Sequence, residues 1–432
     1  MNDKELIIDN INKKRDYCID FLKELVRFDS QVIDQGVYGK EQKAQEHIKK
    51  KFQSMDADKI DLFEPDNGSL KKYNYDFNAG HKYKNRPNVV GKFDFESPGR
   101  SVILNGHIDT VPPAGSIESW KFNPWDPQIE KGRIYGLGVS DMKGGLAATI
   151  LATEFLKELN VIKKGSIIIE SVVDEEGGGN GTLACVDKGY LGDIALIAEP
   201  TNLEVLVAHR GVQLLEIKVN GLSVHAAIKW KGVNAIEKAV KIINGLGELE
   251  KIWLATKKSK YVPNPTITIG FISGGIGATI VPDSCVMRFD IKMIPEDLDE
   301  DMGPSKIRKE VEDWIYRICE GDEWLSKNKP TLNWYCGVSP YENKDISKFK
   351  AFITNTEKVL GKCKITGLPS GTDARLIGNF GKIPTIIFGP GVLGSDSKEF
   401  TGPHSVNESL DIEQYINFIK ILSLSLYDYL NE

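Results

Sequence analysis

Closely spaced cysteines, long apolar runs and an excess of positive charge are all lacking in this sequence. The 432 residues include 6 cysteines, of which the nearest two are Cys319 and Cys336, so there is no CxxC pair. This spacing excludes a zinc finger and a disulfide-dense scaffold. No stretch approaches the roughly 20 apolar residues that a membrane helix needs. Lys plus Arg is 55 and Asp plus Glu is 61, and the resulting net charge of −6 argues against nucleic acid as a partner.

The remaining composition is ordinary for a soluble globular protein, with 41% hydrophobic and 27% charged residues. Residues 1–30 contain acids near the start and no long apolar core, so we interpret them as an amphipathic helix and not as a signal peptide. We therefore expect a cytoplasmic protein without a membrane partner. The length predicts two or three domains.

The predicted strands follow two different hydrophobic patterns, and these patterns divide the chain into domains. Apolar strands alternate with helical patterns in the first part, which predicts an α/β domain with a buried sheet; these strands are expected at 88–94, 101–107, 165–173 and 193–199. From residue 206 the strands alternate polar with apolar positions, and the order becomes βαββαβ, the ferredoxin-like arrangement. The α/β pattern returns at residue 343. The sequence thus predicts a discontinuous domain, 1–205 and 343–432, interrupted by an inserted domain at 206–342.

Acids and histidines follow several of the predicted strands. Sites in open α/β sheets form at the carboxyl ends of the strands, so these side chains are expected to converge. Several carboxylates in a partly buried site need a cation, because an unpaired buried charge costs several kcal/mol. Imidazole with carboxylate suits Zn²⁺, with Co²⁺ or Mn²⁺ as alternatives, and two metals about 3.5–4 Å apart are plausible. The candidates are His107, Asp109, Asp141, Glu175, Glu176, Glu199 and His404.

Each of these residues also has a simpler interpretation. A single acid after a strand is usually a helix cap or a solvated charge, and "GLG" at 136–138 resembles part of a nucleotide-binding loop. Asp141 stands where that loop needs its third glycine, which argues against a nucleotide site. The coincidence of acids and histidines in five separate segments favours a metal centre. Asp109 follows His107 by two positions, so we expect its carboxylate on the same strand face, fixing the imidazole tautomer.

Six short motifs resemble one known family. They are "GHIDTVP", "GLGVSDMKGGLAA", "DEEGGGNGT", "AEPT", "GLSVHAA" and "GPHSVNES", in that order. They are similar to the dizinc amidohydrolases and metallopeptidases that include acetylornithine deacetylase, succinyl-diaminopimelate desuccinylase, aminoacylase and carboxypeptidase G. The resemblance implies a zinc-peptidase-like catalytic domain, with a mixed sheet flanked by helices, and a smaller lid and dimerisation domain at 206–342.

The resemblance also implies roles for individual residues. His107 and Glu199 would hold one Zn²⁺, Glu176 and His404 would hold the second, and Asp141 would bridge both. Glu175 would be the general base that takes a proton from water and passes it to the leaving amine. Asp109 would assist at His107, and Asp174 is interpreted as structural.

Other implied residues concern the partner subunit and the substrate. His225, in the inserted domain, would reach the active site of a second copy in a homodimer. Arg375 in "GTDAR" is the candidate for gripping a substrate carboxylate, and a surface salt bridge is the alternative. Thr372 and Asp373 would shape the pocket. His47, His81 and His209 are interpreted as structural.

The implied substrate is a small N-acyl amino acid, since Glu199 is typical of the deacylases and carboxypeptidases of that family. A metallo-di- or tripeptidase, a carboxypeptidase, and a deformylase or deacylase of an amide that is not an amino acid remain alternatives, as does a binding protein without catalysis. Three departures from the family pattern bear on the substrate. Thr279 replaces a common Asn, Lys292 replaces a common Arg, and an insert at 392–401 precedes His404.

Overall fold

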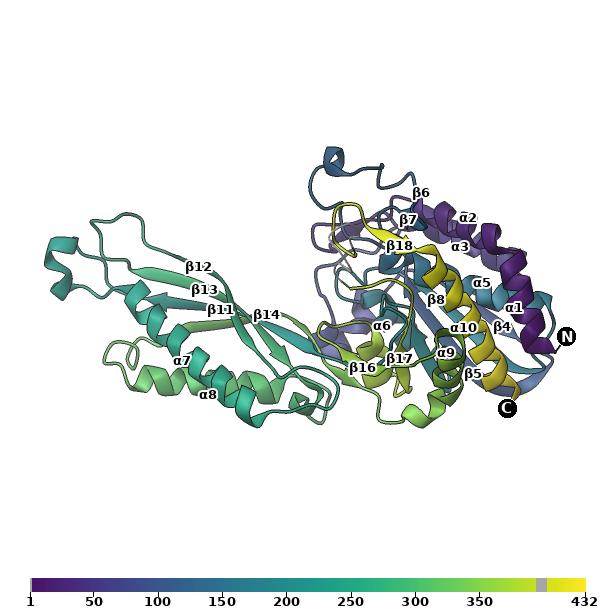
Figure 1. Cartoon of the computed structure of the whole chain (residues 1–432). Helices are drawn as coiled ribbons and strands as arrows, with labels where there is room; N and C mark the ends of the chain where they lie inside the picture. The colour runs from purple at the N-terminus through teal and green to yellow at the C-terminus, as the bar shows by residue number, and fades with distance from the viewer. Residues whose placement is uncertain (1, 394–401) are drawn as a thin grey trace. The chain divides into compact units, whose positions relative to one another are not determined.

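The computed structural model describes residues 2–393 and 402–432, which fold as two compact units (Figure 1). Unit 1 comprises Met1–Val207, Asn343–Thr366 and Thr372–Glu432, and unit 2 comprises Ala208–Glu342 and Gly367–Gly371. The predicted domain division does not include Gly367–Gly371 in the second unit. Among the described residues, no helix has both the length and the apolar character to cross a bilayer.

Unit 1 is built on a mixed β-sheet. Its strands are β3 (Lys59–Phe63), β4 (Asn88–Asp94), β5 (Ser97–His107), β8 (Lys164–Val172), β9 (Ile194–Ile197), β10 (Val205–His209) and β17 (Thr385–Ile387), with β16 (Ile365–Leu368) beside β10. The order across the sheet is β10-β17-β9-β5-β8-β4-β3. The four central strands β17, β9, β5 and β8 are parallel, and β10 and β4 join them antiparallel. The predicted mixed sheet is thus confirmed.

Helices cover this sheet, and Figure 1 shows α1, α5 and α10 beside one another. The helices of unit 1 are α1 (Asp3–Lys13), α2 (Arg15–Val26), α3 (Gln42–Ser54), α4 (Asn67–Leu70), α5 (Gly144–Glu158), α6 (Asn180–Asp187), α9 (Lys350–Leu360) and α10 (Ile412–Asn431). The single helix predicted near the start is divided into α1 and α2 at Lys14. Helix α5 is apolar on nearly every side and is accordingly buried along most of its length.

Small strands complete unit 1. The pair β1 (Val32–Ile33) and β2 (Tyr38–Gly39) forms a short ladder, and β6 (Gln128–Glu130), β7 (Arg133–Tyr135) and β18 (Ser409–Asp411) form a sheet in the order β18-β7-β6. The last pairing brings the segment after His404 beside the segment before Asp141.

A close approach brings the start of α5 against the end of β9. A Cβ placed on Gly145 would lie 1.8 Å from the carbonyl oxygen of Ala198, so only glycine fits there. Because Asp141 precedes this turn and Glu199 follows Ala198, the contact brings two predicted ligand segments together.

Unit 2 has the predicted βαββαβ order. Its elements are β11 (Gly211–Asn220), α7 (Ala235–Thr256), β12 (Ile267–Gly274), β13 (Ser284–Met293), α8 (Ser305–Glu320) and β14 (Thr331–Val338), with β15 (Tyr341–Glu342) paired to the end of β10. The sheet is antiparallel in the order β12-β13-β11-β14. Alternate strand residues such as Ile217 and Phe289 meet Trp253 of α7 and Ile315 of α8 in one apolar core.

A buried carboxylate ties together the helical side of unit 2. Asp322 is 5% exposed and accepts hydrogen bonds from Lys238 Nζ at 2.8 Å and Lys241 Nζ at 2.6 Å. It also accepts from the backbone N–H of Trp324 at 3.0 Å. Burial opposes the charged form, but the two lysine hydrogen bonds outweigh it and hold the pKa of Asp322 below its ordinary value of 3.8.

Replacing this carboxylate by Asp322→Asn should destabilise unit 2 by about 2 kcal/mol, because charge-assisted hydrogen bonds to both lysines are weakened. A folded-state pKa below the unfolded one stabilises the fold above about pH 4, and this stabilisation is lost as the pH falls. Tryptophan-monitored unfolding between pH 3 and 7 should therefore show an acid slope in the wild type that is reduced in the variant. Equal slopes would contradict this assignment.

Candidate metal centre and active site

Five segments of unit 1 meet at the carboxyl ends of the parallel strands. His107 ends β5, Glu175 and Glu176 follow β8, and Glu199 follows β9. Asp141 lies in the turn before α5, and His404 lies in the segment before β18. The structure thus brings together the residues that the sequence predicts as ligands, since parallel neighbouring strands end at one edge.

His107 is the centre of one half of this cluster. Its Nε2 lies 3.2 Å from Asp141 Oδ1 and 3.8 Å from Glu199 Oε1. The other nitrogen, Nδ1, donates to the main-chain carbonyl of Asp109 at 2.9 Å. Because Nδ1 keeps its proton for this carbonyl, Nε2 is the nitrogen that could ligate a metal ion when the proton it shares with Asp141 is displaced.

His404 is the centre of the other half. Its Nε2 lies 3.1 Å from Glu176 Oε1 and 3.6 Å from Asp141 Oδ2. The two oxygens of Asp141 therefore face different histidines, Oδ1 toward His107 and Oδ2 toward His404. A carboxylate in this position has the geometry of a bridge between two cations.

The spacing of these atoms fits metal ligation. Zinc bonds to nitrogen and oxygen are about 2.0–2.1 Å, so neighbouring tetrahedral ligand atoms lie about 3.4 Å apart. The ligand atoms of His107, Asp141 and Glu176 all lie within 4.8 Å of one another, as do those of His107, Glu175 and Glu199. A donor set of imidazole and carboxylate suits Zn²⁺ and also Co²⁺ or Mn²⁺.

The electrostatics of the site also favour a cation. Burial, and then the charge of Asp141, raises the pKa of Glu199 well above its ordinary value. Burial also opposes a charge on His107, but the hydrogen bond with Asp141 and the charge of Glu199 raise its pKa. Without a cation, the site therefore contains more carboxylates than its own histidines can neutralise. A divalent ion would remove the free-energy cost of these buried charges.

Glu175 lies beside the first half of the cluster, within reach of His107 and Glu199. Burial, followed by the charge of Asp373, raises the pKa of the Glu175 carboxyl well above its ordinary value. A carboxylate whose proton affinity is raised in this way is suited to general base catalysis.

Asp109 has a different contact from the predicted one. Its carboxylate oxygen lies 3.7 Å from His107 Nδ1, and the main-chain carbonyl takes that hydrogen bond instead. The carboxylate accepts from the backbone N–H of Glu176 at 3.1 Å and lies 3.4 Å from that of Glu175. The two-residue rule fails here because β5 ends at His107 and the chain turns before Asp109.

The "GTDAR" loop, predicted to lie on the substrate side of the site, is buried and hydrogen-bonded to its surroundings. Arg375 is 2% exposed and donates to the carbonyl oxygens of Gly178 at 2.7 Å and Thr372 at 2.8 Å. Asp373, 1% exposed, has Oδ1 3.4 Å from Arg375 Nη1, and the Thr372 hydroxyl accepts from Ala374 N–H. The guanidinium thus holds two loops together, and the role of Arg375 toward a substrate carboxylate stays a prediction.

Glu408 is a residue of the site that the sequence interpretation missed. Its buried carboxylate accepts from the backbone N–H groups of Gly138 and Ser140, each at 2.8 Å, and of Asp141 at 3.1 Å. It fixes the turn that presents Asp141. Glu408 lies four residues after His404 in the motif "GPHSVNES", and that position is the signal that could have found it.

Two predictions lie outside this cluster. His225 is in unit 2, where it begins a short 3₁₀ turn and its Nδ1 accepts from Ala227 N–H at 3.1 Å. Residues 394–401, most of the insert at 392–401, lie outside the described residues.

Comparison with known proteins identifies the family of the chain. The profile described as "Peptidase family M20/M25/M40" matches residues 103–428. The chain belongs to this family. It is a hydrolase of the M20 type, and the predicted resemblance is thereby confirmed.

Three curated relatives are similar over most of their length. The N-formyl-4-amino-5-aminomethyl-2-methylpyrimidine deformylase of Halalkalibacterium halodurans is 34% identical, over 80% of this chain and 84% of the relative. The deformylase of the same name from Bacillus subtilis is 31% identical, over 82% and 86%. A probable succinyl-diaminopimelate desuccinylase of Staphylococcus aureus is 26% identical, over 89% and 98%.

Two solved structures share the fold. An M20 family metallo-carboxypeptidase from Sulfolobus solfataricus superposes with a TM-score of 0.71 at 18% identity, covering 100% of both chains. A dinuclear metal binding peptidase of the M20 family from Bacillus subtilis has a TM-score of 0.64 at 15% identity, covering 97% of this chain and 99% of that one.

Removing one histidine should remove one metal. We expect equilibrium dialysis against Zn²⁺ to give close to two ions per chain, and His404→Ala to give close to one, because the half formed by His107 and Glu199 stays intact. His47→Ala serves as the matched control, since His47 lies beside Glu24 and away from the cluster. Retention of two tightly bound ions by His404→Ala would contradict the assignment of the second half.

Proposed function

We propose that this M20 chain hydrolyses the amide bond of a small N-acyl compound, with Glu175 as general base. The proposal depends on the position of Glu175, half-buried beside the ligand set of His107 and Glu199 and adjacent to Glu176. His107, Asp141 and Glu199 would hold one metal, and Asp141, Glu176 and His404 would hold the second. When bound, such ions polarise a carbonyl and lower the pKa of water.

The protein side of the reaction is a proton transfer. Glu175 takes a proton from the water that attacks the amide carbon, and the C–N bond breaks as the same proton passes to the leaving nitrogen. The products are a carboxylic acid and an amine. Asp109 supports this step because its carboxylate holds the backbone of Glu175 and Glu176 in place.

We infer that the leaving amine has no carboxylate. Arg375, the predicted carboxylate grip, is buried and donates to main-chain carbonyls. Lys292, which stands where Arg is common, has its Nζ 3.0 Å from Asp290 Oδ2. Two curated relatives, 34% and 31% identical, are named for deformylation of an aminomethylpyrimidine. A formyl group on a neutral heteroaromatic methylamine is therefore the first substrate to test.

A small N-acyl amino acid is the second candidate. The similarity to a desuccinylase over 98% of that relative favours it, as does Glu199 in place of the Asp that is typical of di- and tripeptidases. A peptidase or carboxypeptidase follows as the third. The three classes release different acids, so product analysis separates them.

Glu175→Gln should abolish turnover while the metal content stays at the wild-type value, because the base is not among the proposed ligands. We expect the wild type to release formate from N-formylaminomethylpyrimidine faster than acetate or succinate from N-acyl amino acids. Loss of a base should cost at least 10²–10⁴-fold in kcat. The measurements are product analysis on a substrate panel and metal analysis of both proteins.

Two outcomes would contradict these assignments. Substantial activity in Glu175→Gln would exclude the residue as the base. Faster turnover of an N-acyl amino acid than of the formyl amine would move the substrate assignment to the second candidate.

We also propose that the M20 chain is a homodimer in which His225 acts at the partner's site. Strand β12 lies at an end of the unit 2 sheet, and exposed strand edges are templates for pairing with another chain. Large apolar side chains near this edge are exposed: Phe271 at 43%, Ile272 at 47% and Ile276 at 89%. A patch of this kind is typical of an interaction surface.

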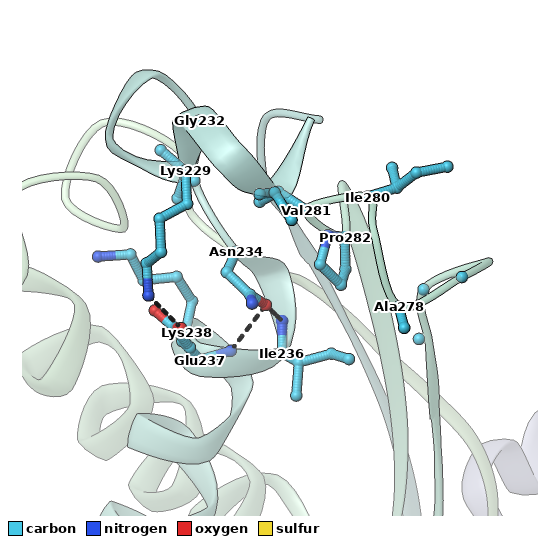
Figure 2. Close-up of a pocket in the computed structure, with 15 residues that line it drawn as sticks. Lys229, Gly232, Asn234, Ile236, Glu237, Lys238, Ala278, Ile280, Val281 and Pro282 are labelled. Atoms are coloured by element: carbon cyan, nitrogen blue, oxygen red, sulfur yellow. Dashed lines mark hydrogen bonds and ion pairs between the residues drawn. The ribbon is translucent and has the colours of Figure 1, made fainter. Parts of the chain in front are cut away.

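The turn that contains His225 lies beside a cavity in unit 2. The cavity is about 540 Å³ and is lined by residues of that turn, by the start of α7 and by the loop before β13, as Figure 2 shows for Lys229, Asn234 and Val281. His225 forms an isolated bridge with Ile280, and Ala226 N–H donates to the carbonyl of Thr279 at 2.8 Å. His225, which the sequence links to the partner's site, and Thr279, a departure that bears on the substrate, are thus neighbours.

Mixing two inactive variants tests action in trans. When His225→Ala and Glu175→Gln are mixed and their subunits reassociate at random, half of the dimers contain one subunit of each variant. Such a mixed dimer has one complete site, which combines Glu175 of one subunit with His225 of the other. About 25% of wild-type activity should return if His225 serves the partner. No gain over the separate variants would mean that the histidine acts within its own chain or not at all.

A further inference from the structure

Asp174 precedes Glu175 and is fully buried. Its carboxylate is enclosed by three partners from residues 81–86: His81 Nδ1 lies 2.9 Å from Oδ2, Tyr83 donates its hydroxyl to Oδ2 at 2.5 Å, and Arg86 Nη2 donates to Oδ1 at 3.2 Å. The sequence interpretation made Asp174 a structural turn residue. These contacts show a more specific arrangement, because all three partners come from one remote segment.

The same cluster contains a second buried carboxylate. Arg86 is 1% exposed, and its guanidinium also donates to Glu41, with Nη2 2.6 Å from Oε1. One guanidinium thus lies between Glu41 and Asp174. A buried carboxylate without such partners costs several kcal/mol, so the position of Asp174 is strongly determined.

The backbone at Asp174 directs the following two residues. Its φ of 69° is left-handed, which is uncommon for a residue with a side chain. The Asp174 carbonyl accepts from Gly179 N–H at 2.7 Å and closes the turn. Glu175 and Glu176 follow at once, with their N–H groups facing the Asp109 carboxylate. The turn is therefore held from two sides, by Asp174 and by Asp109.

The segment before α3 packs tightly against this turn. A Cβ on Gly36 would lie 2.5 Å from the Cα of Gly177 and 2.9 Å from Asp174 Oδ1. Arg86 Nη1 donates to the Gly36 carbonyl at 2.8 Å. The same guanidinium therefore holds both the segment at Gly36 and the Asp174 carboxylate, so a displaced Asp174 has little room to settle elsewhere.

We propose that Asp174, held by Arg86, Tyr83 and His81, is a positioning residue that sets the directions of the Glu175 and Glu176 side chains. This inference rests on the proposed function, in which these two residues are base and metal ligand. A core ion pair with only a structural role would affect stability alone. A positioning residue also affects metal affinity through Glu176 and the catalytic step through Glu175.

The test compares Asp174→Asn with the wild type in three measurements. We expect the dissociation constant of the more weakly bound Zn²⁺ to rise 10- to 100-fold, as is usual when a partner that orients ligands is lost. At saturating Zn²⁺, kcat should remain at least tenfold lower while KM changes by less than about threefold, because binding is kept and the base is misdirected. The unfolding midpoint of the metal-free protein is the third measurement.

Asp322→Asn is the matched control, since Asp322 is a buried carboxylate with cationic partners in unit 2. It should lower the unfolding midpoint and leave zinc affinity and kcat unchanged. Wild-type zinc affinity and kcat in a folded Asp174→Asn would overturn the proposal, whatever the change in stability.

Tyr83→Phe provides a second variant in case Asp174→Asn does not fold, because it removes one hydrogen bond to the carboxylate. It should weaken zinc binding and lower kcat in the same direction but by a smaller factor, and no change in either would also overturn the proposal. All values are taken relative to the wild type. Failure of the proposed function, which would appear as wild-type inactivity or an active Glu175→Gln, is therefore distinguishable.

Discussion

The gathering of carboxylates at one edge of the unit 1 sheet is the constraint on which the site depends. Asp141, Glu175, Glu176 and Glu199 converge there with two imidazoles, and burial makes the negative charges of Glu175 and Glu199 costly. The surrounding backbone offsets part of that cost, and a bound cation would offset the rest. Much of the local structure can be understood as the means of holding like charges close together.

The topology of the sheet explains why the groups meet. Strands β17, β9, β5 and β8 are neighbours and parallel, so their carboxyl ends form one row although their sequence positions are far apart. Gly145 then permits the start of α5 to approach the end of β9, which brings the Asp141 turn to the same row. The strand order and the close backbone approach are therefore both needed to gather the predicted ligands, since no single segment contains them all.

The sequence predicts some features of this site better than others. His107, Asp141, Glu176, Glu199 and His404 stand in recognisable motifs at predicted strand ends, so periodicity and motif order were enough to bring them together. The direction of the Asp109 carboxylate was beyond such reasoning, because it depends on where β5 stops. The loop contacts of Arg375 were beyond it for a similar reason: residue type suggests a carboxylate partner, but only the packed loops reveal that Arg375 donates to the carbonyls of Gly178 and Thr372. Glu408 acts through backbone N–H groups, so only its position four residues after His404 in the motif could have pointed to it.

The buried cationic side chains near the site bind to the surrounding loops and turns and not to the predicted metal ligands. Arg86 lies between Glu41 and Asp174, and Arg375 donates to loop carbonyls. Lys143 donates to the carbonyl of Phe28, and burial lowers its pKa to about 7, so its charge is only partly present at neutral pH. Each cation fixes a turn that presents a predicted ligand or the base. Had these cations faced the carboxylates directly, the protein would have satisfied its own site, and no charge would remain to hold a metal. The cationic side chains therefore order the turns around the site. The carboxylate cluster itself keeps its negative charge, which a divalent ion would neutralise.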